Sequence, residues 1–74
     1  LSSEVVRLLD LLKIVVETTI NGLQSLFISV SDSEMDLSVE CAADLSFLVS
    51  SNVTVKQEDG LWLIRTLIGG VNGA

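Results

Sequence analysis

The N-terminal segment, up to Asn21-Gly22, constrains the fold most, because it predicts a helix that is apolar over most of its circumference. Its polar positions form one narrow ribbon whose charges alternate in sign at three- and four-residue spacing, which supports a helix. These residues are Glu4, Arg7, Asp10, Lys13 and Glu17. The apolar positions at helical spacing are Val5, Leu8, Leu9, Leu12, Val16, Ile20 and Leu23, with Leu11, Ile14 and Val15 beside them. Such a helix is covered on two sides in a folded protein.

Both ends of this helix have recognisable signals. Ser2 or Ser3 can cap its N-terminus, and Glu4 follows in the first turn, where a negative charge is favourable. We expect the helix to end at Asn21-Gly22, because Asn and Gly tolerate the left-handed conformation of a C-terminal cap.

The rest of the chain predicts two hairpins joined by a short helix. Apolar and polar residues alternate on both sides of the polar turn in residues 26–41, and again around Asp59-Gly60 in residues 52–68. Residues 42–51 predict a short helix with Leu45, Leu48 and Val49 inward. The order α-β-β-α-β-β predicts an α+β two-layer sandwich, with the long helix on an antiparallel sheet of two hairpins. We expect one domain over residues 1–74, with residues 69–74 as a flexible tail.

The apolar content is high for so small a domain. A chain of 74 residues buries only about 60% of the surface that its unfolded form exposes. Apolar residues make up 49% of it, with a mean hydropathy of +0.63, so we expect an apolar surface that pairs with a second copy or another protein. Trp62, on a strand, is either a core residue or an interface anchor. The helix residues predicted at the interface are Leu8, Leu11, Leu12, Val15 and Val16.

Composition argues against several classes of function. A net charge of −6 leaves no basic surface for a nucleic-acid backbone. No apolar run reaches the ~18 residues of a membrane span, and charges interrupt the opening segment, which argues against a signal peptide. Because Cys41 is the only cysteine, no internal disulfide can form, and we predict a reducing, cytoplasmic compartment. An alternative is an acidic decoy of a basic nucleic-acid-binding protein, formed by Asp32, Glu34, Asp36, Glu40 and Asp44.

The chain offers little material for catalysis or metal binding. Asp32, Glu34 and Asp36 have the alternate spacing of a calcium loop, but Leu37 and Ala43 stand where that loop needs Gly and Glu. The chain contains no His to activate a nucleophile or to ligate zinc. We therefore predict a protein without catalysis, metal or cofactor.

One motif points the other way. Glu17 and Asn21 form an E-x-x-x-N pair, one helical turn apart. The segment resembles a helix of the ATPase domain of sensor histidine kinases and their relatives, the Bergerat fold. The resemblance implies that Asn21 would hold magnesium near the phosphates, and that Glu17 would activate water as in the hydrolases of that superfamily. It also implies a similar order of elements along nearly the whole chain.

The residues that bind nucleotide in that family are replaced here. Cys41-Ala42-Ala43 stands where the family has a D-x-G motif whose Asp binds the adenine amino group. No glycine lies between Gly22 and Gly60, so the Gly-rich lid over the phosphates is missing. The sequence therefore favours a degenerate, nucleotide-free, regulatory or scaffolding relative, with a nucleotide-binding domain that uses Glu17 and Asn21 as the alternative.

Overall fold

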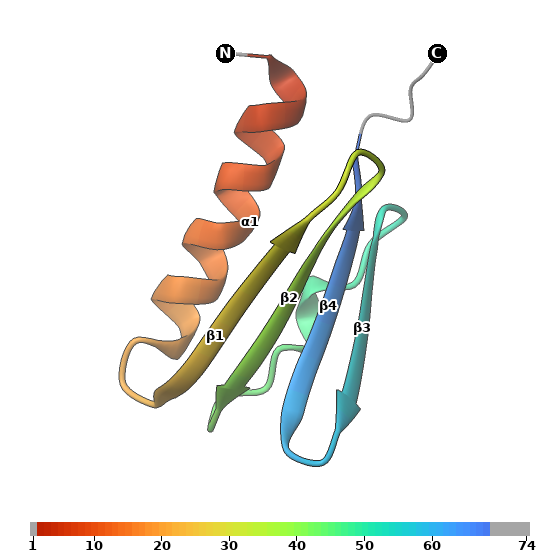
Figure 1. Cartoon of the computed structure of the whole chain (residues 1–74). Helices are drawn as coiled ribbons and strands as arrows, with labels where there is room; N and C mark the ends of the chain where they lie inside the picture. Colours follow the sequence, from red (N-terminus) through yellow and green to blue (C-terminus); the bar gives the residue numbers. More distant parts are fainter. Residues whose placement is uncertain (1, 69–74) are drawn as a thin grey trace.

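A computed structural model describes residues 2–68 as one helix and one four-stranded antiparallel sheet (Figure 1). The elements are α1 (Ser3–Thr19), β1 (Leu23–Val30), β2 (Glu34–Cys41), the single 3-10 turn η1 (Ser46–Leu48), β3 (Val53–Glu58) and β4 (Leu61–Leu67). The strand order is β1-β2-β4-β3. The predicted α+β class and both hairpins are confirmed. The predicted tail, residues 69–74, lies outside the described residues.

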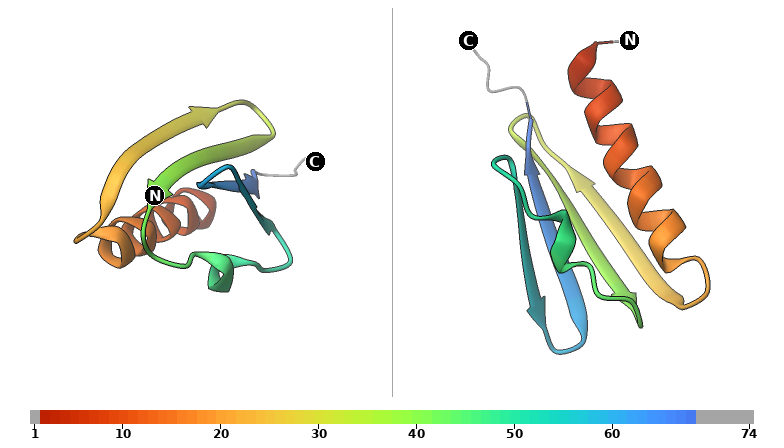
Figure 2. Two further views of the ribbon diagram at one scale, coloured as in Figure 1. Left: turned by 90° about the horizontal axis from the view of Figure 1, so that it is seen from below. Right: turned by 180° about the vertical axis from the view of Figure 1, so that it is seen from behind.

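The helix and the η1 segment lie on the same face of the sheet, which curls around them (Figure 2). α1 lies at the β1 side and η1 nearer to β3. The opposite face of the sheet is uncovered by any element of residues 2–68. The molecule therefore has two layers, which are the sheet and, on one of its faces, α1 with η1.

The core lies between the two central strands and the elements that cover them. Strands β2 and β4 pair in register, with Val39 opposite Trp62 and Leu37 opposite Ile64. Because side chains alternate across a strand, every second residue of each points toward the helix. The buried apolar residues are Leu11, Val15, Met35, Leu37, Val39, Leu45, Leu48, Val53, Trp62 and Ile64.

Two buried threonines have hydrogen-bond partners, which removes the cost of burying their hydroxyls. Thr19 donates to the carbonyl oxygen of Val15 at 2.8 Å, one turn earlier in α1. Thr66 accepts from Arg7 Nη1 at 2.7 Å. Arg7 also donates to the carbonyl oxygen of Leu67 and to Glu4, so this one guanidinium ties the start of α1 to the end of β4.

The helix begins as predicted and ends differently. Ser2 is the N-cap, and its Oγ accepts from the N–H of Val5 at 3.1 Å. The left-handed cap predicted at Asn21-Gly22 is wrong, because within residues 2–68 only Asp59 and Gly60 have positive φ. A turn closes instead, with the N–H of Gly22 donating to the carbonyl of Thr19 at 2.9 Å. The positive φ at both Asp59 and Gly60 fits the hairpin turn predicted there.

The helix predicted over residues 42–51 is wrong: it is reduced to η1. Asp44 Oδ1 accepts from both the N–H and the hydroxyl of Ser46, a local contact that competes with helix formation. Leu45 and Leu48 are buried as predicted, and the single turn already turns both inward. Val49 has extended backbone and an exposed side chain, so the predicted inward position of Val49 is also wrong.

We expect Leu37→Ala to lower the free energy of unfolding by about 2–5 kcal/mol, because Leu37 is fully buried in a central strand and its loss leaves a cavity. Leu67→Ala is the matched control. The Leu67 side chain is exposed, so its truncation should change stability by no more than about 0.5 kcal/mol. Urea unfolding measures both, and equal losses would contradict this core.

Candidate functional site

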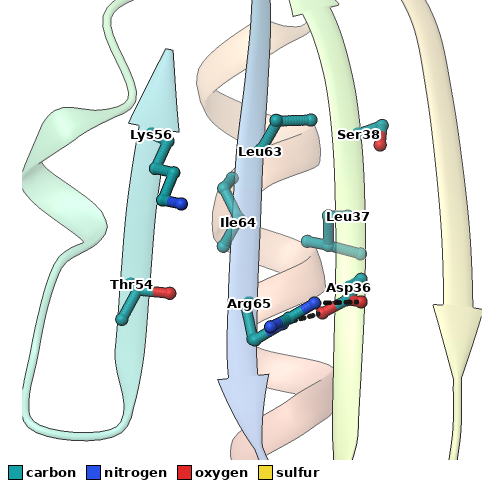
Figure 3. A pocket seen from close by; sticks show the side chains of 8 residues that line it. All are labelled: Asp36, Leu37, Ser38, Thr54, Lys56, Leu63, Ile64 and Arg65. Atoms are coloured by element: carbon teal, nitrogen blue, oxygen red, sulfur yellow. Dashed lines mark hydrogen bonds and ion pairs between the residues drawn. The ribbon is translucent and has the colours of Figure 1, made fainter. Parts of the chain in front are cut away.

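The uncovered face of the sheet carries a shallow groove of about 490 Å³ (Figure 3). The strand register places Asp36 of β2 directly opposite Arg65 of β4, and the two side chains point toward each other. The residues that line the groove are Asp36, Leu37, Ser38, Thr54, Lys56, Leu63, Ile64 and Arg65.

Arg65, at one end of this groove, binds two acidic side chains, Asp36 and Glu34. Its Nε and Nη2 donate to the two carboxylate oxygens of Asp36 at 2.9 and 3.3 Å, and Nη2 lies 3.1 Å from Glu34 Oε2. The hydrogen bond from Arg65 keeps the pKa of Asp36 below its ordinary value of 3.8, and Asp36 in turn raises the pKa of Arg65. Both partners are solvent-exposed, so this pair contributes little to stability.

The other polar side chains that line the groove are one amine and two hydroxyls. Lys56 forms no ion pair within residues 2–68, Ser38 and Lys56 lie on either side of Leu63, and Thr54 lies opposite Arg65. In the same part of the chain, no three His, Cys, Asp or Glu side chains gather closely enough to hold a metal ion.

A second hollow, of about 380 Å³, lies between α1 and the η1 segment. Arg7, Asp10 and Ile14 line it from the helix, and Phe47 and Val49 line it from the other side. Both Phe47 and Val49 are exposed. This hollow identifies which flank of α1 faces η1.

The opposite flank of α1 faces the free edge of β1 and carries exposed apolar side chains. The turn of residues 20–22 joins the end of α1 to the start of β1, and the two elements diverge with distance from this turn (Figures 1 and 2). Along β1, Leu26 is half-buried, Ile28 is 49% exposed and Val30 is 63% exposed, as this divergence requires. We call this surface the β1 margin. Its exposed residues are Val5, Leu9, Val16, Ile20, Ile28 and Val30, whereas the exposed Phe27 of the same strand points to the outer face of the sheet.

The structure divides the predicted interface residues into two groups. Leu11, Val15 and Trp62 are buried in the chain's own core and are unavailable to a partner while the chain stays folded. For Trp62, this is the core alternative considered from the sequence. Leu8 and Leu12 are half-buried against that core, whereas Val16 is exposed. The sequence pattern missed Ile28 and Val30, because alternation in a strand shows a buried face without showing how much of it the helix covers.

The candidate nucleotide pair is not held on one helix. Glu17 lies in the last turn of α1, and Asn21 lies in the turn that follows it. Both side chains are exposed, and neither lines either of the two hollows.

The other candidate residues are also accounted for by local contacts. Cys41 is half-buried, and its thiol lies 3.5 Å from the carbonyl oxygen of Ala43. Glu40 accepts from the hydroxyl of Ser25 at 3.2 Å. Hydrogen bonds from Ser46 lower the pKa of Asp44. Since Glu34 and Asp36 are also bound to Arg65, only Asp32 of the five proposed decoy carboxylates has none of these contacts.

Comparisons with known proteins identify no relative. No family model, curated protein or solved structure matches the chain significantly. Within the described residues, no helix has the length and apolar character needed to cross a membrane.

We expect the pKa of Asp36 to rise toward 3.8 in Arg65→Met, because that change removes the hydrogen bond that lowers it. The folded-state pKa lies below the unfolded value, so the stability from this contact is present above the unfolded pKa and is lost as pH falls through the folded one. Carboxyl NMR titration measures the pKa. Asp44, whose pKa Ser46 lowers, is the internal control, and an unchanged Asp36 pKa would contradict the assignment.

Proposed function

We propose that this chain is a small, non-catalytic interaction module that self-associates through the exposed flank of α1. The observation that carries the proposal is the row formed by Val5, Leu9, Val16 and Ile20. These four residues follow one helical stripe, and all are exposed. Fully burying a side chain of this size is worth about 1.5–3 kcal/mol, so covering the row supplies a substantial driving force.

The polarity around this row suits a protein partner. Lys13 and Glu17 lie beside it on the solvent side of the helix. An apolar centre with a charged rim is the usual arrangement of a protein–protein contact. A continuous exposed apolar surface of this kind marks interaction sites on small proteins.

The compartment and ancestry form part of the same proposal. A single half-buried thiol at Cys41 suits a reducing, cytoplasmic setting. The succession of a helix and two hairpins supports a degenerate relative of the histidine-kinase ATPase domain that acts as a regulatory or scaffolding element. The exposed, separated positions of Glu17 and Asn21 favour this non-catalytic form over a nucleotide-binding one.

We expect Val16→Glu to weaken self-association by roughly tenfold or more, because it would bury an unpaired charge in the contact. Val16 is 44% exposed in the single chain, so the variant should still fold. Val49→Glu is the matched control, since Val49 is 61% exposed in the hollow beside η1. Sedimentation velocity over a concentration series compares both with the parent chain. Equal behaviour of all three would rule out this flank of α1.

We expect millimolar Mg-ATP to leave the melting temperature unchanged. A ligand at 100 times its Kd stabilises by about 2.7 kcal/mol, which corresponds to roughly 10–20 °C in a domain of this size. Differential scanning fluorimetry makes this comparison, with Glu17→Ala and Asn21→Ala as controls. A shift that both variants abolish would replace the interaction module with a nucleotide-binding domain.

A further inference from the structure

The two edges of the sheet differ in how they are protected from other strands. β1 is an edge strand of eight residues, LQSLFISV, without a charge or a proline. β3, at the other edge, is shorter and carries Lys56 and Glu58. Charged residues and short length are the usual devices that keep an edge from pairing with another chain. Only the β1 edge lacks them.

The backbone groups that β1 leaves unpaired can be assigned from its register with β2. The N–H of Ser31 donates to the carbonyl of Glu34 at 2.9 Å, and hydrogen-bonded pairs alternate along an antiparallel ladder. Ser29 and Phe27 therefore bond to their β2 partners, Asp36 and Ser38. The N–H and C=O groups of the intervening residues point out of the free edge. These residues are Leu26, Ile28 and Val30.

We infer that β1 pairs antiparallel with β1 of a second copy, about a two-fold axis at Phe27. The four strands of each copy then form one continuous sheet. Leu26 then lies opposite Ile28 of the partner subunit, and both carry free backbone groups. Directly opposite residues of an antiparallel pair point to the same face, so inner side chains meet inner ones. Phe27, which is 71% exposed, meets Phe27 of the partner subunit on the outer face.

The same axis also covers the exposed flank of α1. α1 and β1 diverge from the turn that joins them (Figure 1), and Val5 and Leu9 on the exposed flank of α1, like Val30 at the end of β1, are exposed. The two-fold axis reverses the direction of the partner subunit, so the C-terminal end of its α1 lies near these three residues. The two helices then pack antiparallel. The helix and the strand are both about 25 Å long, which lets the two layers meet along the same length.

A second copy fits this surface in charge and in area. The chain carries −6, but β1 itself is uncharged, so the pairing brings no like charges opposite one another. A strip about 25 Å long and 20 Å deep, across one helix layer and one sheet layer, is roughly 500 Å² in projection, and the accessible area of such a strip exceeds its projection. This matches the order of the roughly 800 Å² per partner of a stable interface. The protected β3 edge limits growth to two copies.

Amide hydrogen exchange on the parent chain tests this pairing, which rests on the proposed self-association. The amides of Leu26, Ile28 and Val30 should become protected as the protein concentration rises through the dimerisation range. A dimer that leaves these three amides unprotected would overturn the edge pairing while the self-association stands. A monomer at all concentrations would overturn both.

The two phenylalanines supply a matched pair of variants. We expect Phe27→Lys to weaken the dimer by about tenfold or more, because it removes an aromatic contact and places like charges opposite one another. Phe47→Lys is the control, since Phe47 is 58% exposed in η1, away from β1. Both variants should keep the fold. Dimerisation that Phe27→Lys leaves intact would also overturn the pairing.

Discussion

The packing of one helix against the middle of a four-stranded sheet determines the rest of this structure. Leu11 and Val15 of α1 fill the inner face of β2 and β4, where Leu37 and Ile64 are fully buried. A helix about 10 Å wide cannot cover four strands that are each about 4.8 Å apart. The η1 segment covers part of the remainder, with Leu45 and Leu48 in the core. The inner side chains near the end of β1 stay exposed.

This shortage of cover connects the fold to the proposed function. The divergence of α1 and β1 leaves Val30 exposed, the flank of α1 beside it is apolar and exposed, and the strand order leaves the β1 edge unpaired. A single partner that adds a strand and a helix would satisfy all three at once. In the outer groove, two of the charged side chains, Asp36 and Arg65, already bind each other, and the groove exposes no row of apolar side chains like that of α1.

Much of this fold could be predicted from the sequence, because its signals are local. Alternation and Asp59-Gly60 predicted the two hairpins, and the charge ribbon predicted the long helix. The buried face of that helix could not be predicted, since its apolar residues cover two flanks and the buried stripe of Leu11 and Val15 ends in a polar residue, Thr19, whose hydroxyl bonds to the Val15 carbonyl. The short helix failed because Asp44 binds Ser46 locally. Strand order brings Asp36 to Arg65, and no local pattern specifies strand order.

The molar mass of the parent chain in solution, from light scattering on a sizing column across a dilution series, tests the central claim most directly. If a second copy covers the β1 margin, the molar mass should be about twice 7.9 kDa at micromolar concentration and should fall toward the single-chain value on dilution. A mass of 7.9 kDa at every concentration would contradict self-association and would leave the β1 margin as surface for a different protein.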